Sequence, residues 1–326
     1  MKRARITGTG SYVPEKILTN TELESMVDTT DEWISTRTGI RQRHIAAPGE
    51  FTSDLAANAA KRALVAAGVA AADIDLIIVA TITGDYPWPA TACLVQEKIG
   101  AKRAFAYDVS AACSGFIFAL DAACRQIETG AIKKALVIGA EVFSRILDWT
   151  DRNTCVLFGD GAGAVVLEPS EDDRGIIATR LHSDGSYVEL LYQPGFGSRN
   201  PATAEALSQR LNYIKMQGNE VFKVAVRMLS EVAQEVLAAG GMTIDQVDLL
   251  IPHQANRRIL DATAKRLGLA EDRVYINVDR YGNTSAATIP IALDEVVRAH
   301  RLQAGQHLVL NAFGGGFTWG AALIRW

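Results

Sequence analysis

The sequence predicts an α/β fold with two similar halves, and two observations carry this prediction. Strand-like apolar runs alternate with helical runs along the 326 residues, which is the pattern of α/β proteins. The chain also repeats itself: residues 64–80 align without a gap with residues 237–253, and the motif Phe-Gly-x-Gly occurs at 158–161 and again at 313–316. Because both repeats keep the same order about half a chain apart, duplication explains them better than chance.

The individual elements follow from these runs and from the residues at their ends. Ser53 and Asp54 can cap the first long helix, and Gly130 ends the second. The expected elements are a helix at 55–68, strands at 75–81 and 104–109, a helix at 114–130, strands at 133–141 and 161–169, a helix at 221–241 and a strand at 247–253.

The chain is longer than a usual single domain. A polar, turn-rich segment at residues 169–175 interrupts the apolar runs. We therefore expect an N-terminal half at residues 1–172 and a C-terminal half at residues 173–326.

The composition excludes several classes of protein. With 48% hydrophobic residues and a net charge of −4, the chain does not have the basic balance of a nucleic-acid-binding protein. No run approaches the roughly 18 apolar residues of a membrane span, and no apolar run of a signal peptide follows the basic N-terminal residues. The four cysteines form no C-x-x-C pair and have no histidine at metal-ligand spacing. We expect reduced thiols, no metal site and a cytoplasmic location.

Cys113 is the strongest candidate for a nucleophile. It lies between a predicted strand and a predicted apolar helix, where free N–H groups and the helix dipole favour negative charge. We expect this position to lower the pKa of the thiol. Taken alone, a cysteine in this position more often fills a gap in the core, which is the interpretation we prefer for Cys93, Cys124 and Cys155.

Two further polar residues stand where apolar elements end. His253 ends a buried strand, a position from which α/β proteins direct side chains into a cleft, although a lone histidine is more often structural. Asn283 lies in a turn before a helix, and its amide can donate into a site, while the turn itself also reads as an ordinary helix cap. The glycines of residues 313–317 gather backbone N–H groups suited to an oxyanion hole.

The order and spacing of several motifs resemble those of one enzyme family. The motifs are GTGSYVPEKILTN, VDTTDEWISTRTGIRQRHIAAP, AACSGF, GDGAGAVVLE, LHSDGSY, MQGNEVFKVAV, PHQANRRI, YGNTSAA and AFGGGFTWG. Nearly end to end, the chain is similar to β-ketoacyl-acyl-carrier-protein synthase III, which starts bacterial type II fatty-acid synthesis. The resemblance implies a thiolase fold, with two similar halves layered α-β-α-β-α, and a homodimer.

The resemblance also implies a catalytic set and a reaction. Cys113, His253 and Asn283 match the family's catalytic residues. Cys113 would take an acyl group, acetyl first, from acyl-coenzyme A, and His253 and Asn283 would stabilise the enolate formed when malonyl-acyl carrier protein loses carbon dioxide. The backbone N–H groups of Cys113 and Gly315 resemble the oxyanion hole, and Phe313 lies beside the malonyl carboxylate. No metal or redox cofactor is implied.

Further residues match the family's carrier contacts. Trp33 and Arg152 would sandwich the adenine of coenzyme A, and Arg37 would face its phosphates, although Trp33 could also be a core aromatic and the arginines solvated charges. The predicted pantetheine channel comprises Gly218, Phe222 and Asn256.

A basic surface is expected beside this channel, because acyl carrier protein is acidic. The family's carrier-binding segment corresponds to Gln254, Ala255, Asn256, Arg257 and Arg258, and Lys265, Arg266, Lys223 and Arg227 can extend it, although charge runs are usually solvated faces. Trp88 falls where the family places a residue that closes the acyl pocket of the partner subunit, which predicts a short primer. The alternative is that Trp88 turns into its own core.

Two functions from other classes fit the sequence less well. A dinucleotide-binding oxidoreductase is disfavoured because Gly8-Thr9-Gly10 lacks the third glycine of the fingerprint. A catalytically silent acyl-binding protein of the same fold is disfavoured by the intact Cys-His-Asn set. Elongating synthases with two histidines and thiolases with a second catalytic cysteine do not fit the motifs.

Overall fold

Two β-sheets form the frame of the protein, and the computed structural model describes residues 2–326. The first sheet has the strand order β1-β7-β6-β4-β5. Its strands are β1 (Ala4–Tyr12), β4 (Leu76–Ala80), β5 (Phe105–Val109), β6 (Ala135–Val142) and β7 (Asp160–Pro169). Strand β4 runs parallel to β5 and β6, whereas β7 is antiparallel to both β1 and β6.

The second sheet is built from the rest of the chain in the order β11-β12-β13-β8. Its strands are β8 (Gly175–Ser183), β11 (Leu249–Pro252), β12 (His307–Gly314) and β13 (Thr318–Arg325). Strands β11 and β12 are parallel, and the other pairs are antiparallel. The chain passes from the first sheet to the second between Pro169 and Gly175, and the division at residue 172 stays a proposal.

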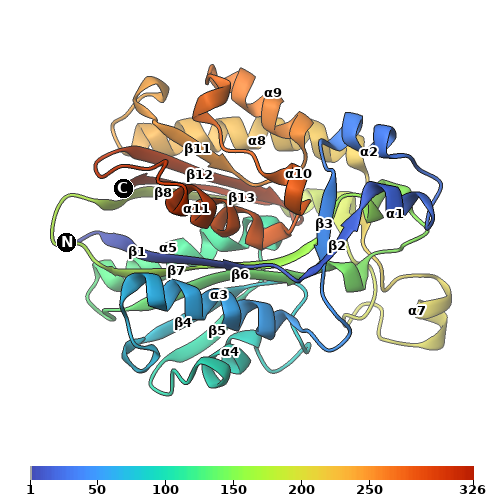
Figure 1. The fold of residues 1–326 in the computed structure, drawn as a ribbon, viewed down its shortest axis with the longest axis horizontal. Helices are drawn as coiled ribbons and strands as arrows, with labels where there is room; N and C mark the ends of the chain where they lie inside the picture. Colours follow the sequence, from blue (N-terminus) through green and yellow to red (C-terminus); the bar gives the residue numbers. More distant parts are fainter. Residues whose placement is uncertain (1) are drawn as a thin grey trace.

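Helices cover the outer face of each sheet and fill the space between the two sheets (Figure 1). Helices α3 (Thr52–Ala67) and α4 (Thr91–Ile99) lie outside the first sheet, and α8 (Gly218–Ala239) and α9 (Arg257–Leu267) lie outside the second. Helices α5 (Gly115–Glu128) and α11 (Thr288–Arg298) lie between the sheets, where one apolar cluster joins them to strands of both. The predicted α-β-α-β-α layering is confirmed.

The two halves of the sequence repeat correspond in space. Each repeat begins in an outer helix, α3 or α8, and ends in the strand that follows it, β4 or β11. The boundaries differ from the expectation at the first helix, which begins at Thr52. The Asp54 carboxylate accepts the backbone N–H of Phe51, while the Ser53 hydroxyl donates to Asp85 instead of capping the helix.

Short elements gather at one end of the molecule (Figure 1). They are β2 (Lys16–Thr19), α1 (Asn20–Glu24), α2 (Asp31–Thr38), β3 (Gln42–Ile45), α6 (Arg152–Cys155), β9 (Leu191–Tyr192), α7 (Ala204–Ser208), β10 (Lys215–Met216) and α10 (Val278–Tyr281). The carboxyl ends of parallel strands such as β4 and β11 open toward this end, which is where α/β folds place their sites. In the described part of the chain, no helix combines the length and apolar character that crossing a membrane requires.

Candidate active site

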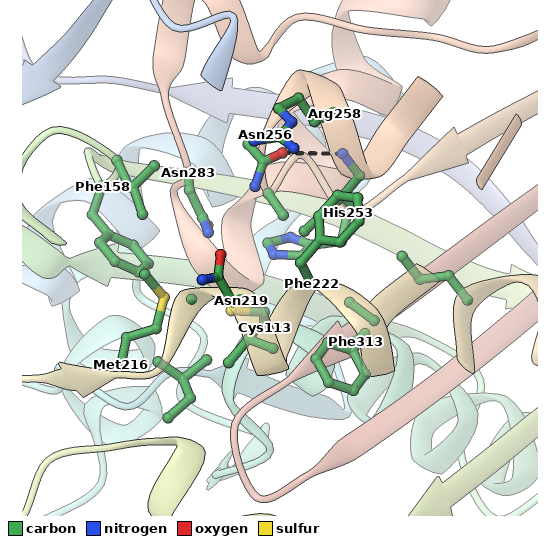
Figure 2. A pocket seen from close by; sticks show the side chains of 18 of the residues that line it. Cys113, Phe158, Met216, Asn219, Phe222, His253, Asn256, Arg258, Asn283 and Phe313 are labelled. Carbon is green, nitrogen blue, oxygen red and sulfur yellow. Dashed lines mark hydrogen bonds between the residues drawn. The ribbon is translucent and has the colours of Figure 1, made fainter. Parts of the chain in front are cut away.

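A cleft of about 230 Å³ brings together the three side chains expected to carry the chemistry. Cys113, His253 and Asn283 all line it, although they come from distant parts of the chain (Figure 2). Cys113 lies in the turn Ala112–Ser114 that leads from β5 into α5. His253 directly follows β11, and Asn283 precedes α11. The fold therefore brings side chains from both halves of the sequence together in this cleft.

The Cys113 thiol is almost fully buried, with 6% of the residue exposed. Burial raises the pKa of Cys113 to about 12, and the nearby Glu141 carboxylate adds to the increase, while a hydrogen bond from the Ser285 side chain acts in the opposite direction. The expected lowering by the helix start is thus outweighed by desolvation. In the free enzyme Cys113 is a protonated thiol, so its ionisation must be coupled to substrate binding or to proton transfer.

His253 is held as a neutral imidazole. Burial lowers its pKa to about 3, because no carboxylate lies close enough to favour the charged form. Its Nδ1 lies 2.7 Å from Thr288 Oγ1, and its backbone N–H donates to Asn311 at 2.8 Å. These contacts orient the ring so that its other nitrogen is available to the cleft.

Asn283 is oriented by its neighbours in the turn. Its backbone N–H donates to the Leu157 carbonyl at 2.8 Å, and its Oδ1 accepts the backbone N–H of Ser285 at 2.8 Å. Because the oxygen end of the amide is occupied, the Nδ2 group is left to face the cleft (Figure 2). Ser285 adopts a φ of 52°, a conformation uncommon outside glycine, which permits this contact.

The loop after β12 packs directly against the nucleophile. A Cβ atom added at Gly314 would lie 2.6 Å from the backbone nitrogen of Cys113, so only glycine allows this approach. Phe313 is buried, lines the cleft and meets Phe317 edge to face at 4.6 Å. Gly315 borders a second, smaller cavity that also reaches Cys113.

This second cavity is apolar and has a volume of about 50 Å³. It extends from Cys113 and is bounded by Ile82, Phe143, Ile146, Phe158, Leu191, Tyr192, Gln193 and Ile214. The rings of Phe143 and Phe158 stack at 4.3 Å, which forms one rigid wall. A group attached to the sulfur can therefore enter a small apolar space while the rest of its carrier occupies the larger cleft.

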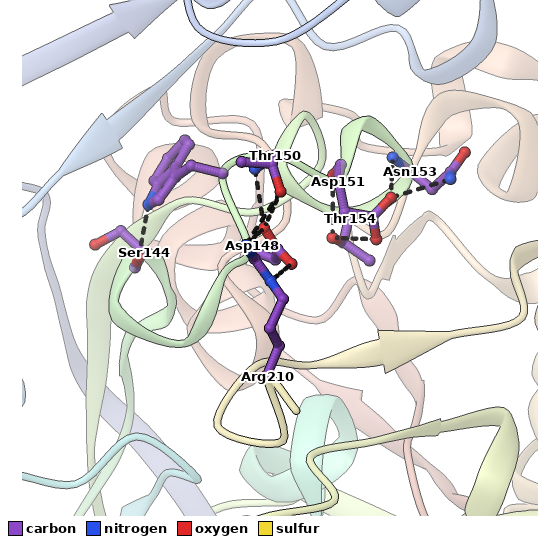
Figure 3. Close-up of polar contacts among 8 residues, drawn as sticks. Ser144, Asp148, Thr150, Asp151, Asn153, Thr154 and Arg210 are labelled. Carbon is purple, nitrogen blue, oxygen red and sulfur yellow. Dashed lines mark hydrogen bonds and ion pairs between the residues drawn. The ribbon is translucent and has the colours of Figure 1, made fainter. Parts of the chain in front are cut away.

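An ion pair joins two of the segments that form this cavity (Figure 3). Asp148 accepts hydrogen bonds from Arg210 and from the hydroxyl and backbone N–H of Thr150. These bonds hold the pKa of Asp148 below its usual value, against the effect of burial. A backbone hydrogen bond from Ile214 to Ile146 at 3.0 Å lies beside them, so the cavity walls from the two segments are fixed to one another.

The residues expected to bind coenzyme A lie at two places. Arg37, Gly218, Phe222 and Asn256 line the cleft. Trp33 lies outside the lining and is stacked by both Arg37 and Arg152, whose guanidinium carbons are 4.6 and 5.1 Å from the ring centroid. Arg152 also donates to the Asp28 carbonyl at 2.9 Å. The three side chains form one cluster, of which Arg37 lines the cleft.

The expected carrier-binding segment divides into buried and exposed residues. Gln254 is 1% exposed and donates to the carbonyls of Pro252 and Tyr275, so the expectation that its side chain contacts a carrier does not fit this position. Arg257 is paired with Asp261 and Glu271.

Arg258 is the exposed cation of this segment. It lines the cleft, and its guanidinium lies 5.5 Å from the Phe222 ring. Ala255 also lines the cleft, and Asn256 caps α9 by accepting the Ile259 N–H at 3.0 Å. Arg258 is thus the residue of the segment best placed to meet an acidic partner at the entrance.

Sequence reasoning missed four residues around the site. Ser285 contacts Asn283 in the turn before α11, and Thr288 contacts His253 from the first position of α11. Asn219 lines the cleft at the start of α8. Glu141 is buried at the end of β6 and hydrogen-bonds to Ser285. Ser285 and Thr288 lie within five residues of Asn283, and this proximity was the available signal. Among residues 2–326, no group of three or more His, Cys, Asp or Glu side chains is placed to hold a metal ion.

Comparison with known proteins places this site in a family. Residues 107–185 match the family described as 3-oxoacyl-[acyl-carrier-protein (ACP)] synthase III, and residues 237–326 match its C-terminal domain. The β-ketoacyl-[acyl-carrier-protein] synthase III of Thioalkalivibrio sulfidiphilus is 56% identical over 100% of both chains. That of Xylella fastidiosa is 55% identical over 99% of this chain and 98% of its own. The crystal structure of the Aquifex aeolicus 3-oxoacyl-[acyl-carrier-protein] synthase III, 49% identical, gives a TM-score of 0.93 over 99% of this chain and 100% of that chain.

The fold, the site and these relatives define an acyl-transferring condensing enzyme of the thiolase fold. More particularly, the chain belongs to the β-ketoacyl-[acyl-carrier-protein] synthase III family. The resemblance expected from the sequence motifs is confirmed.

Proposed function

We propose that this enzyme starts fatty-acid synthesis by joining an acyl group from acyl-coenzyme A to malonyl-acyl carrier protein. One observation carries the proposal: a thiol and two hydrogen-bonding side chains face a single cleft, and a small apolar cavity also borders the thiol. Such an arrangement can hold an acyl group covalently while a second thioester enters the cleft.

In the first half-reaction, the Cys113 sulfur attacks the thioester carbon of acyl-coenzyme A. A sulfur–carbon bond forms, and coenzyme A leaves as a thiolate. The backbone N–H groups of Cys113 and Gly315 are proposed to stabilise the oxyanion that develops on the carbonyl oxygen. The acyl chain lies in the small cavity that borders both residues.

In the second half-reaction, malonyl-acyl carrier protein loses carbon dioxide, and the electrons of the broken bond form an enolate. Asn283 Nδ2 and His253 donate to its oxygen, and its carbon then attacks the acyl-cysteine carbonyl, which releases Cys113. For this purpose the single proton of the Thr288 hydroxyl must turn from the Ser285 carbonyl, 3.0 Å away, to His253 Nδ1, 2.7 Å away, and the ring proton is then on Nε2. A neutral imidazole suffices, because decarboxylation needs donors for developing negative charge and no strong base.

The size of the small cavity favours acetyl as the primer. A cavity of about 150 Å³ holds benzene in another protein. The cavity beside Cys113, at about 50 Å³, is a third of that volume and matches a group of about two carbons. A longer chain must displace its packed walls, among which Phe143 and Phe158 are 1% and 2% exposed.

The partners in this proposal are coenzyme A and an acidic carrier protein. Trp33, Arg37 and Arg152 supply stacking and positive charge for the nucleotide end of coenzyme A. The exposed cations Lys223, Arg227, Arg258 and Lys265 lie on the adjacent helices α8 and α9, and they supply a basic face for acyl carrier protein. The mechanism requires no metal or redox cofactor, and we place the enzyme in the cytoplasm.

We also propose a homodimer that forms along β5. This strand is an edge of the first sheet, and its backbone can pair with a second copy. Trp88, Tyr86 and Phe105 are 86%, 59% and 49% exposed, so Trp88 does not turn into its own core. An apolar surface beside a free sheet edge favours burial in a dimer, in which Trp88 would reach the acyl cavity of the partner subunit.

The proposal is tested by mixing the enzyme with acetyl-coenzyme A and malonyl-acyl carrier protein. Formation of 3-oxobutanoyl-acyl carrier protein and carbon dioxide in equal amounts is expected. Replacing acetyl-coenzyme A by acetyl-acyl carrier protein should greatly slow the reaction. Product formation without any acyl-coenzyme A dependence would contradict it.

A further inference from the structure

Glu141 is a buried acid that the mechanism above does not use. It stands near the end of β6, is fully buried, and accepts hydrogen bonds from the Thr81 hydroxyl at 3.2 Å and the backbone N–H groups of Ile82 and Thr83 at 3.2 and 3.1 Å. The Thr83 hydroxyl also donates to it. Within residues 2–326, no lysine, arginine or histidine forms an ion pair with it. A charge buried without a cation is costly, so this carboxyl is poised to bind a proton.

Ser285 connects Glu141 to the nucleophile. The Ser285 hydroxyl donates to Glu141 Oε1 at 3.1 Å. The turn Ser285–Ala287 also packs against the turn Ala112–Ser114 that carries Cys113, where the Ser285 side chain acts to lower the pKa of the thiol. The turn that carries Ser285 approaches β6 closely, because a Cβ atom at Gly139 would overlap the Ala286 carbonyl. Ser285 thus lies between Glu141 in the sheet and Cys113 in the cleft.

Glu141 and Cys113 also influence each other's ionisation through their charges. Burial raises the pKa of Glu141 to about 7, in spite of its five hydrogen bonds to neutral donors. The Glu141 charge in turn contributes to the raised pKa of Cys113. Two negative charges in one dry site oppose each other, so ionisation of either group favours the protonated form of the other.

We propose that Glu141 is a positioning residue for the nucleophile: acting through Ser285, it takes up a proton as Cys113 becomes a thiolate, so that the pair carries one negative charge rather than two. The inference deepens the proposed function, and it rests on Cys113 as the nucleophile.

The proton is conserved among Cys113, Ser285 and Glu141. The Cys113 thiol proton moves to Ser285 Oγ while the Ser285 hydroxyl proton moves to Glu141, and the sulfur keeps its electron pair. The sulfur then bonds to the thioester carbon, and the carbon–sulfur bond to coenzyme A breaks. The departing coenzyme A thiolate takes up the proton that Glu141 gives back, which restores the carboxylate.

Within the described residues, every hydrogen-bond partner of Glu141 is neutral. The segment after β4 presents only Thr81, Ile82 and Thr83 to Glu141, and the turn before α11 presents Ser285. Cys113 is the titratable group on the remaining element that faces it. His253, across the cleft, stays neutral because burial lowers its pKa to about 3.

The shared proton has a specific consequence for pH dependence. At pH values below its pKa, a thiol that loses its proton to water becomes about tenfold more ionised for each unit by which the pH rises. When the proton stays on Glu141 instead, the thiolate population stops rising once the pH exceeds the Glu141 pKa of about 7. Between pH 7 and 9 the native enzyme should therefore gain about twofold in Cys113 reactivity, and Glu141→Gln about 100-fold.

The experiment measures alkylation of Cys113 by iodoacetamide between pH 6 and 9, with the modified peptide quantified by mass spectrometry. Asp294→Asn is the matched control, because Asp294 is also a buried acid but bonds to Thr9 and Ser11 on a different part of the first sheet. Its profile should follow that of the native enzyme.

A plateau in the native enzyme and a continued rise in Glu141→Gln would support the proposal. Parallel profiles in the two proteins would overturn it, since a purely structural role shifts the rate equally at every pH. If Glu141→Gln does not fold, the native profile decides alone: a tenfold rise per pH unit between 7.5 and 9 excludes a shared proton. The assay needs no substrate, so its failure is distinct from a failure of the proposed reaction, which would appear as a lack of acyl transfer.

Discussion

Replacing Ile214 by alanine should change which primers the enzyme accepts. Ile214 is 4% exposed and forms part of the wall of the 50 Å³ cavity beside Cys113. The substitution removes three carbon atoms from this wall, which is the number by which pentanoyl exceeds acetyl. Each buried methylene contributes about 0.8 kcal/mol, so seating three of them favours pentanoyl by about 2.4 kcal/mol. The ratio of kcat/KM for pentanoyl- over acetyl-coenzyme A should rise by about 50-fold.

The assay compares the two coenzyme A esters as competing substrates, with the acyl-carrier products separated by mass spectrometry. Loss of a buried isoleucine side chain also destabilises the fold by about 2–5 kcal/mol, so rates are taken well below the melting temperature. Ile74→Ala serves as the control, because Ile74 is fully buried but does not line the cavity. An unchanged ratio in a folded Ile214→Ala enzyme would refute the assignment of this cavity to the acyl chain.

The remaining predictions concern His253, the carrier surface and the proposed dimer. Thr288→Val removes the hydrogen-bond partner of His253 Nδ1 and should slow condensation by about ten- to hundred-fold while Cys113 still acylates. Thr288→Ser should restore the rate of condensation. A loss of acylation as large as the loss of condensation would contradict this role. Arg258→Glu should raise the KM for malonyl-acyl carrier protein about tenfold at low salt and leave acylation by acetyl-coenzyme A unchanged, whereas Lys133→Glu, on a distant surface, should alter neither. Trp88→Ala should weaken dimerisation in sedimentation experiments and increase octanoyl use; a monomeric native enzyme would exclude this role.

The order of elements around the reacting residues could be predicted from the sequence. Cys113 stands between an apolar strand and an apolar helix, and His253 is polar at the point where a buried strand ends, so local pattern placed both at the same edge of their sheets. The motif order placed Asn283 with them. These features depend on residues close in sequence, which is why pattern alone reveals them.

Contacts between distant segments could not be predicted in this way. Glu141 and Ser285 are 144 residues apart, and only the packing of the turn before α11 against β6 joins them. The pKa of Cys113 was expected to fall because the helix start was visible in the sequence, whereas the depth of burial that raises it was not. The two arginines that follow Gln254 closely in sequence suggest an exposed side chain, yet its amide donates to buried backbone carbonyls.

The most direct test of the account is the mass of the intact enzyme after brief mixing with acetyl-coenzyme A alone. We expect one acetyl group per chain, found on the peptide that contains Cys113, and its disappearance when malonyl-acyl carrier protein is added. Cys113→Ala should remain unmodified, while Asn283→Ala should keep the acetyl group after malonyl-acyl carrier protein is added. An acetyl group on Cys93 or Cys155, or none on the native enzyme, would contradict the central claim that Cys113 carries the primer.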